Sequence, residues 1–133
     1  MSDIVNDFFK RFYPSDAQLE SAKVRGGFCG IARSVDGVDN IFPMMVCADG
    51  FSMSVQGHYG AYSIPRDDFA LNYTSVEVGY PSERIAELMP YIDGDPNTID
   101  PTNTLYGYVP VDVVVSLIEK HNGLKPEPLE TAP

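Results

Sequence analysis

The chain has 133 residues, of which 44% are hydrophobic, and its formal net charge at pH 7 is −10. This length is typical of a single domain, and the 8 Tyr and 7 Phe residues exclude a disordered chain, which is poor in aromatic residues. The sequence contains no apolar run long enough to span a membrane, and its first residues lack a signal-peptide pattern. It therefore predicts a cytoplasmic protein that makes no membrane contact.

The two cysteines, Cys29 and Cys47, are too few for a disulfide framework and do not have the spacing of a zinc knuckle. A four-ligand zinc site would have to add His58 and His121 to them, and no spacing rule favours that set. We therefore expect two reduced thiols, and we expect neither a metal nor a cofactor.

Most of the negative charge lies in the second half of the chain. Residues 1–66 contain seven acidic and six basic side chains, whereas residues 67–133 contain twelve acidic and three basic ones. Nucleic-acid binding depends largely on Lys and Arg contacts with phosphates, so direct nucleic-acid binding is not expected. The charge favours a partner with a basic protein surface, and greater solubility is the alternative.

The first elements predicted are two short helices, which would form a helical hairpin over residues 1–25. Ser2 is a capping residue before a stretch of apolar residues at helical spacing, and Ser15 opens a capping-box pattern for the second helix. The hairpin is expected to pack on a sheet, and docking on a partner is the alternative. The apolar residues of the first helix are Ile4, Val5, Phe8, Phe9 and Phe12.

Asp49 and Gly50 predict the two-residue turn of a β-hairpin, because this pair tolerates the positive φ angles of a type I′ turn. One face of the hairpin would then be apolar and face the core, and the other would be small and polar. The expected core face consists of Met44, Val46, Ala48, Phe51, Met53 and Val55, and the opposite face of Cys47, Ser52, Ser54 and Gln56.

The second half of the chain predicts further elements of the same sheet. Residues 74–80 alternate as a half-buried strand that would place Glu77 on the polar face of the hairpin, and residues 105–109 form another strand. A helix is expected over residues 83–89, ended by Pro90, and a longer one from Pro110. The longer helix would bury Val111, Val114, Leu117, Ile118 and His121 and end with Gly123 at its C′ position.

Together these elements predict an α+β fold: a small antiparallel sheet of about four strands with helices packed on one face. A strand over residues 28–33 would precede the hairpin. Residues 1–124 would form one domain. Residues 125–133 are rich in proline and poor in apolar side chains, so they predict a flexible tail.

The stretch over residues 57–73 has no clean period but many side chains suited to recognition, so we consider it a candidate site. The alternative is an ordered surface loop in which Arg66 pairs with a nearby carboxylate. A second loop, over residues 91–103, is acidic and lacks the spacing of a calcium-binding loop. The candidate binding residues are Tyr59, Tyr62, Arg66, Asp67 and Asp68 in the first loop and Asp93, Asp95 and Asp100 in the second.

A weaker alternative is a small hydrolase or ligand-binding enzyme that uses the loop over residues 57–73, and its most specific form is a Cys/His hydrolase. Cys29 would be the nucleophile and His58 the base, with Asp67 or Asn72 orienting the imidazole. Cys29 is predicted inside a strand and not at a helix N-terminus, where a thiolate would be stabilised. The protein is therefore expected to be non-enzymatic.

Several short sequence segments resemble segments of small uncharacterised proteins of tailed bacteriophages and prophages, over roughly residues 46–124. These segments are DGF at 49–51, SVQ at 54–56, PRD at 65–67, VEVGYPS at 76–82, YGYVPV at 106–111 and KHNG at 120–123. The resemblance implies an accessory protein made in the host cytoplasm that binds a host or phage component. Such a protein could inhibit a nucleic-acid-binding machine by occupying its basic surface, and a virion or assembly component is a further alternative.

Overall fold

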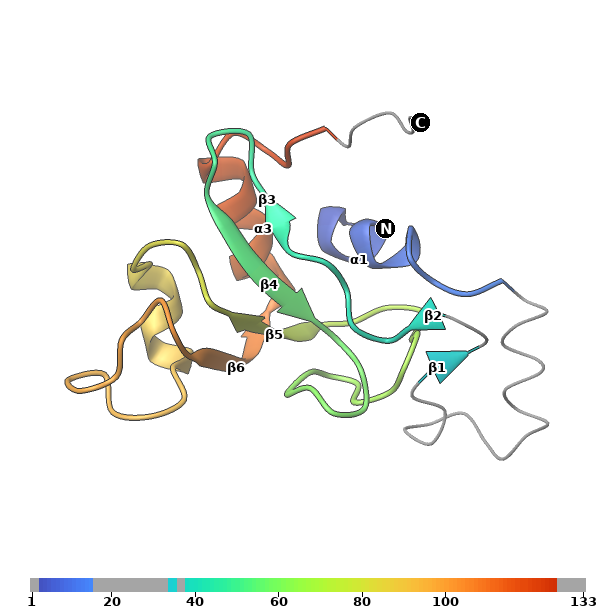
Figure 1. The fold of residues 1–133 in the computed structure, drawn as a ribbon, viewed down its shortest axis with the longest axis horizontal. Helices are drawn as coiled ribbons and strands as arrows, with labels where there is room; N and C mark the ends of the chain where they lie inside the picture. The colour runs from blue at the N-terminus through green and yellow to red at the C-terminus, as the bar shows by residue number, and fades with distance from the viewer. Residues whose placement is uncertain (1–2, 16–33, 36–37, 127–133) are drawn as a thin grey trace.

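The computed structural model describes residues 3–15, 34–35 and 38–126. It confirms the predicted α+β class, with a four-stranded antiparallel sheet in the order β3-β4-β5-β6 (Figure 1). Each strand of this sheet therefore lies beside its neighbours in sequence. The elements are α1 (Ile4–Lys10), β1 (Ser34–Val35), β2 (Val38–Asp39), β3 (Met45–Val46), β4 (Ser52–Gln56), β5 (Ser75–Gly79), the 3₁₀ helix η1 (Ala86–Tyr91), β6 (Leu105–Pro110) and α3 (Val111–Lys120).

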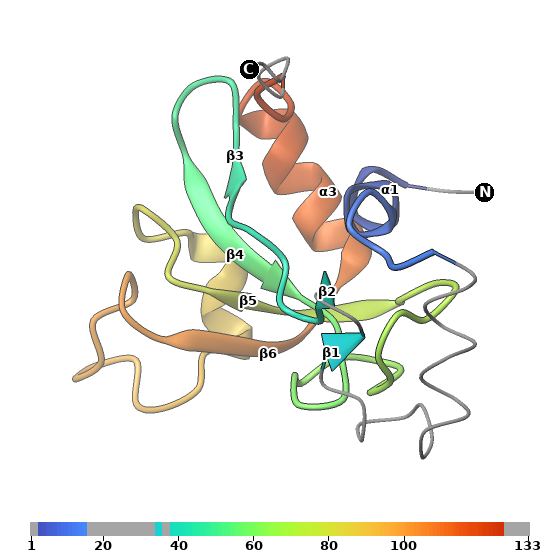
Figure 2. The same cartoon turned by 45° about the vertical axis from the view of Figure 1, so that its right-hand side comes forward.

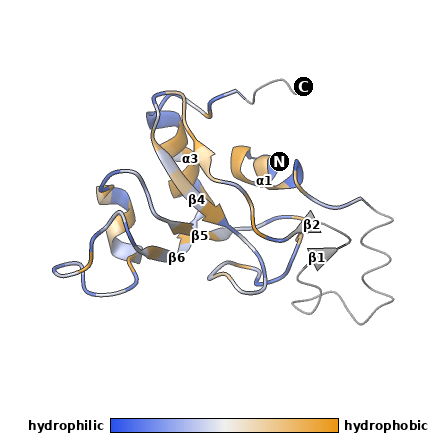
Figure 3. Ribbon diagram, in the orientation of Figure 1, coloured by the Kyte–Doolittle hydropathy of each residue, from blue (hydrophilic) through white to orange (hydrophobic). Residues whose placement is uncertain are grey.

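Helices α1 and α3 lie together on one face of the sheet, and the two views in Figures 1 and 2 agree on this arrangement. Apolar residues, orange in Figure 3, mark much of α3 and of the strands that it faces. The fully buried side chains between the layers include Val5, Phe9, Met45, Met53, Val55, Val76, Val78, Val114 and Ile118. The second helix predicted within residues 15–25 and the strand predicted over residues 28–33 lie outside the described residues.

Helix α1 begins one residue later than the sequence predicts. Its N-cap is Asp3 and not Ser2, because the Asp3 carboxylate accepts a hydrogen bond from the Asn6 amide at 2.8 Å. On its buried side, the Phe9 ring stacks on Phe42 with a centroid distance of 4.4 Å and meets the edge of Tyr73 at 5.4 Å. Such aromatic pairs each stabilise a core by about 0.5–1.5 kcal/mol beyond the area they bury.

The hairpin is present, but its turn is one residue longer than predicted. The Cys47 amide donates to the Phe51 carbonyl at 2.7 Å, and the Gly50 amide donates to the Cys47 carbonyl at 2.9 Å. These bonds close a three-residue loop whose last residue, Gly50, has a φ of 98°. Asp49 does not share that left-handed conformation, and a type I′ turn requires it at both central positions.

The longer turn shifts the register of β3 by one residue, so that Met45 pairs with Met53. A shift of one residue sends every side chain of a strand to the other face. The prediction for β3 was therefore wrong: Met45 and Cys47 are fully buried, whereas Met44 and Val46 are 45% and 37% exposed. The faces predicted for β4 are correct, with Phe51, Met53 and Val55 in the core.

Strand β3 does not extend back to Phe42, because there the side chain of Gln56 takes the place of a partner strand. The side-chain Oε1 of Gln56 accepts from the backbone amide of Phe42 at 2.8 Å, and the side-chain Nε2 of Gln56 donates to the backbone carbonyl of Phe42 at 2.8 Å. Gln56 thus satisfies both backbone groups of Phe42 in a buried position.

The helix predicted over residues 83–89 is instead the 3₁₀ helix η1, and it does not end at Pro90. Pro90 lies inside η1, which ends at Tyr91. Ile85 and Leu88 are buried, and Met89 is half-buried. The tighter winding of a 3₁₀ helix suits this short segment.

Helix α3 confirms the predicted apolar face, because Val111, Val114, Leu117, Ile118 and His121 are all buried. Its end differs from the prediction by one residue. Asn122 has a φ of 73° and is the C′ residue, and the amide of Gly123 donates to the Ile118 carbonyl at 2.8 Å. This bond, together with one from the Asn122 amide to the Glu119 carbonyl at 3.1 Å, defines a Schellman motif.

Both outer edges of the sheet are partly paired. Leu124 pairs with Cys47 beside β3, and Ile92 pairs with Tyr106 beside β6. The Lys125 amide donates to a β3 carbonyl at 2.8 Å, so the first residue of the predicted flexible tail is fixed to the sheet. Within the described parts of the chain, no helix has the length and apolar character needed to cross a membrane.

Candidate binding site on the second face of the sheet

A β-bulge in β6 brings Tyr108 to the face of the sheet that α1 and α3 leave uncovered. Val76 pairs with Val109 and Val78 pairs with Tyr106, so two residues of β6 lie opposite the single residue Glu77. Without the bulge, strict alternation would place Tyr108 beside Tyr106 in the core. Instead Tyr106 is fully buried and Tyr108 is 43% exposed, with a φ of 53°.

Tyr62, from the candidate loop over residues 57–73, packs against Tyr108. The ring centroids lie 5.7 Å apart, and the Tyr108 amide donates to the Tyr62 carbonyl at 2.9 Å. Gly107 permits this approach, because a Cβ atom at that position would lie 3.1 Å from the Cβ of Tyr62. The bulge and the loop therefore hold two exposed aromatic rings in a fixed geometry.

Arg66 and Tyr59 extend this pair of rings. The Arg66 guanidinium lies 5.5 Å from the centroid of the Tyr62 ring, and its Nε donates to the Tyr59 carbonyl at 3.3 Å. Tyr59 and Tyr62 are 51% and 42% exposed. We call the set Tyr59, Tyr62, Arg66 and Tyr108 the tyrosine patch. The sequence predicted three of its members and missed Tyr108, since no local signal marks the bulge.

Glu77 lies below the patch on β5, opposite Gln56 as predicted. Its carboxylate accepts from the Tyr62 amide at 3.3 Å. Burial raises the pKa of Glu77, and the Asp93 carboxylate raises it further, while the Tyr62 amide and Arg66 act in the opposite direction. Asp93, an exposed residue of the predicted acidic loop, thus contributes to the raised pKa of Glu77.

Asp95 and Asp100 are exposed and stabilise turns within their own loop. An Asp95 carboxylate oxygen accepts from the Asn97 amide at 2.9 Å, and one from Asp100 accepts from the Thr102 amide at the same distance. The bond from Thr102 lowers the pKa of Asp100. The Asp100 carboxylate is therefore ionised at neutral pH, and both exposed side chains could face a cationic partner.

Asp68 was predicted to bind a partner, but the structure places it inside the loop. It is fully buried, and its Oδ1 accepts from the Asn40 side chain at 3.1 Å and from the Tyr59 amide at 3.0 Å. Its Oδ2 has no hydrogen-bond donor among the described residues. Asp68 is thus a structural group that fixes the backbone of the patch, and the prediction of a surface contact was wrong.

Tyr73, the last residue of the loop over residues 57–73, connects this loop to α1 and to its own backbone. Its backbone amide donates to Asn6 Oδ1 at 2.7 Å, and its hydroxyl donates to the carbonyl of Asp67, one of the predicted site residues. Burial raises the pKa of Tyr73 to about 12, so its hydroxyl stays protonated at physiological pH. The loop over residues 57–73 is therefore tied to α1 and to its own backbone.

The Cys/His hydrolase remains an untested prediction because Cys29 lies outside the described residues. His58 is buried, and its Nδ1 accepts from the Gly60 amide at 3.1 Å. In a catalytic triad, the carboxylate that orients the histidine accepts a hydrogen bond from a protonated Nδ1. In His58 the Nδ1 atom is itself the acceptor of a hydrogen bond. Cys47 is buried, and burial raises the pKa of its thiol, so it is a poor nucleophile.

His121 has partners that sequence reasoning missed. Its Nδ1 lies 2.7 Å from an oxygen of Asp49, the turn residue of the hairpin, and its Nε2 lies 3.9 Å from Glu83. The ring stacks on Phe51 at 4.3 Å. These groups and Ser82 line a hollow of about 280 Å³. Since Asp49 and His121 are 72 residues apart, no local pattern could have paired them.

No cluster of three metal-ligating side chains occurs among residues 3–15, 34–35 and 38–126. The fold and the tyrosine patch define this chain as a small α+β protein with an exposed aromatic surface. Its comparison with protein-family models, with curated proteins and with solved structures found no match.

Proposed function

We propose that this protein is a non-enzymatic binding protein that engages a basic protein surface through the tyrosine patch. The observation behind this proposal is the exposed Tyr62–Tyr108 pair, which a bulge and a glycine hold on the uncovered face of the sheet. Tyrosine and arginine are enriched among the residues that dominate binding energies, because their rigid groups bury much surface at low entropic cost.

Carboxylates next to the patch supply the charge for such a partner. Glu77 lies beneath it, the Asp93 carboxylate acts on Glu77, and Asp93, Asp95 and Asp100 are exposed. Glu77 and the exposed acidic groups of the loop over residues 91–103 would attract Lys and Arg side chains and steer their approach. The partner chemistry that fits is a basic protein groove.

The resemblance to proteins of tailed bacteriophages supports a host or phage partner, namely a machine whose nucleic-acid-binding surface this protein would occupy. In that setting the site of action is the host cytoplasm. Occupation of a cationic groove by carboxylates would exclude the phosphate backbone from it.

Affinity capture with the full chain, followed by mass spectrometry, tests this proposal. Tyr62→Ala and Tyr108→Ala should each remove the captured partner or weaken its binding by about tenfold or more, which is the effect of an interface hot spot. Tyr80→Ala is the matched control, because Tyr80 is also exposed and lies beyond the end of β5. Equal losses in all three variants would contradict the proposal.

Salt provides a second measurement on the same complex. Because the proposed contacts are largely between opposite charges near the surface, the dissociation constant should rise when NaCl is added. A salt-independent affinity would remove the electrostatic part of the proposal. Presence of the protein at a fixed copy number in purified virions would instead favour an assembly component.

A further inference from the structure

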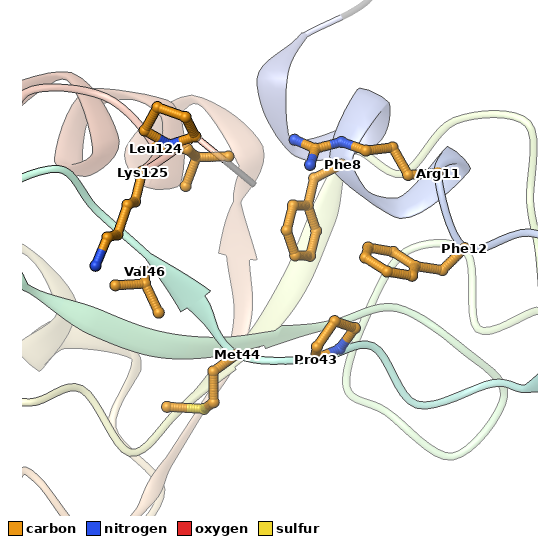
Figure 4. A pocket seen from close by; sticks show the side chains of 9 residues that line it. Phe8, Arg11, Phe12, Pro43, Met44, Val46, Leu124 and Lys125 are labelled. Carbon is orange, nitrogen blue, oxygen red and sulfur yellow. The ribbon is translucent and has the colours of Figure 1, made fainter. Parts of the chain in front are cut away.

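The hollow beside His121 contains charged and unpartnered polar groups, which distinguishes it from a larger groove of the molecule. That groove, about 620 Å³ in volume, lies between α1, β3 and the segment that follows α3 (Figure 4), and its mainly apolar lining does not select one class of ligand. The hollow beside His121 measures about 280 Å³. Its lining comes from the turn between β3 and β4, from Ser82 and Glu83 after β5, and from the end of α3.

Asp49 and Phe51 fix the position of the His121 ring. The Asp49 Oδ2 atom lies 2.7 Å from Nδ1, and the Phe51 ring stacks on the imidazole at a centroid distance of 4.3 Å and an interplanar angle of 15°. Hydrogen bonds from the Phe51 amide and then from His121 lower the pKa of Asp49, so this carboxylate is ionised at neutral pH and can only accept. Nδ1 must therefore donate, and a neutral ring has its lone pair on Nε2.

The Nε2 atom of His121 has no hydrogen-bond partner among the described residues, although the residue is only 8% exposed. The Glu83 carboxylate lies 3.9 Å from Nε2, beyond hydrogen-bond distance, and 60% of the Glu83 side chain is exposed. A buried acceptor without a partner is unfavourable. A cation bound between Nε2 and Glu83 would supply the missing interaction.

The charge of the hollow is negative. Asp49 and Glu83 are carboxylates in its lining, and no Lys or Arg of the described residues lines it. Lys120, the neighbour of His121 in the chain, instead pairs with Glu87 at 3.2 Å. The hollow therefore favours a positively charged ligand.

The segment that carries Glu83 is fixed to the sheet. The Ser82 amide donates to the Ser52 carbonyl at 2.8 Å, and the Ser82 hydroxyl oxygen accepts from the Ser52 amide at 3.0 Å. A tetrahedral zinc ion holds nitrogen and carboxylate ligands at about 2.0–2.2 Å, which places two ligand atoms about 3.4 Å apart. The Glu83 oxygen would therefore approach Nε2 by about 0.5 Å, a movement that an exposed side chain can make.

We propose that Glu83 and the Nε2 atom of His121 bind a divalent transition-metal ion such as Zn²⁺. An imidazole with a carboxylate suits this class of ion, whereas Mg²⁺ and Ca²⁺ prefer oxygen ligands alone. Asp49 contacts the opposite nitrogen of the ring, so it orients the histidine as carboxylates do in many metal sites and is not itself a ligand. Two protein ligands leave the other coordination positions to water. This site is separate from the proposed binding of a basic protein by the tyrosine patch.

The test is an NMR titration of the full chain, labelled with ¹⁵N in its histidine rings, with Zn²⁺. The chain contains two histidines. The Nδ1 atom of His58 accepts from the Gly60 amide, so His58 and His121 have opposite tautomers and their signals can be distinguished. We expect a saturable shift of the His121 Nε2 signal at 1:1 stoichiometry, no shift of His58, and no response of either ring to Mg²⁺.

Three variants locate the ligands. Glu83→Gln should weaken Zn²⁺ binding at His121 by about tenfold or more, and Asp49→Asn by about 10- to 100-fold, because an amide can donate to Nδ1 and move the ring proton to Nε2. Glu87→Gln is the matched control, since Glu87 is also an exposed carboxylate but pairs with Lys120 outside the hollow. It should leave the affinity unchanged. Circular dichroism checks that all three variants fold.

The remaining outcomes would overturn the proposal. An unchanged His121 Nε2 signal, or an affinity that Glu83→Gln does not alter, would exclude this metal site. A shift of His58 alone would place Zn²⁺ elsewhere in the chain. A proton that stays on Nε2 in the presence of Zn²⁺ would assign the group to an ion pair between His121 and Glu83. A response to n-butylammonium but not to Zn²⁺ would assign the hollow to a Lys side chain of a partner.

Discussion

The substitution Asn6→Ala tests how the N-terminal helix holds the loop of the tyrosine patch. Asn6 is 1% exposed, and its side chain forms two hydrogen bonds with the backbone of Tyr73, one at 2.7 Å to the amide and one at 3.0 Å to the carbonyl. Alanine leaves both buried backbone groups without a partner, and each costs about 1–3 kcal/mol. We expect a total loss of about 2–4 kcal/mol, toward the lower values because the small space left admits water.

For a domain of this size, that loss corresponds to a fall in Tm of about 6–15 °C. Chemical denaturation followed by circular dichroism measures the free energy of unfolding, and hydrogen exchange measures protection of the Tyr73 amide. The control is Asp3→Ala, which removes the N-cap of the same helix and should cost about 1 kcal/mol. The reasoning is refuted if Asn6→Ala costs no more than Asp3→Ala and the Tyr73 amide keeps its protection.

Three further substitutions give distinct stability signatures. Burial raises the pKa of Glu77, so its ionisation opposes folding; Glu77→Gln should stabilise the protein at pH 7, and urea titrations should find this gain absent below about pH 4. Hydrogen bonds from the Phe51 amide and then from His121 lower the pKa of Asp49, so Asp49→Asn should lower the free energy of unfolding at pH 7. The effect of this substitution should disappear once the pH has fallen through the folded-state pKa of Asp49, and a loss of stability that persists in acid would contradict this. Gln56→Ala should cost about 2–4 kcal/mol by thermal denaturation, because it orphans the amide and carbonyl of Phe42.

Local patterns predicted the elements whose partners are close in sequence. The apolar face of α3 and the alternation of β5 follow from periodicity alone, and both are present. Pro110, which was predicted to lie in the first turn of the helix, is instead its N-cap and the last residue of β6. These patterns were sufficient for the α+β class, because a meander of neighbouring strands needs no long-range information. Of the tyrosines in the loop over residues 57–73, Tyr59 and Tyr62 are exposed and Tyr73 is buried, and the role of this loop as a binding site stays a prediction.

The errors arose where one local sequence suits two different structures. Asp49-Gly50 suits both a two-residue turn and a three-residue turn that ends in a left-handed glycine, and the choice sets the face of every β3 side chain. Cys47, which is buried while Val46 is exposed, pairs with Leu124 at the outer edge of β3. That contact joins residues 77 positions apart, and no sequence window contains both.

Tyr108 illustrates a third kind of limit. Its exposure depends on the bulge opposite Glu77, and Tyr62 from the loop over residues 57–73 packs closely against Gly107 within that bulge. The sequence YGYV is compatible with a regular strand. The complete candidate site is therefore visible only in the structure, which brings Tyr62 and Tyr108 beside each other.

The pairing of Leu124 with β3 also has a consequence for synthesis of the protein on the ribosome. Strands β3 to β6 are sequential and can pair as they emerge, but the outer edge of β3 gains its partner only after residue 125 has left the exit tunnel. Until then the nascent chain presents an unpaired strand beside the exposed side chains of Met44 and Val46. Unpaired edges of this kind promote aggregation between chains.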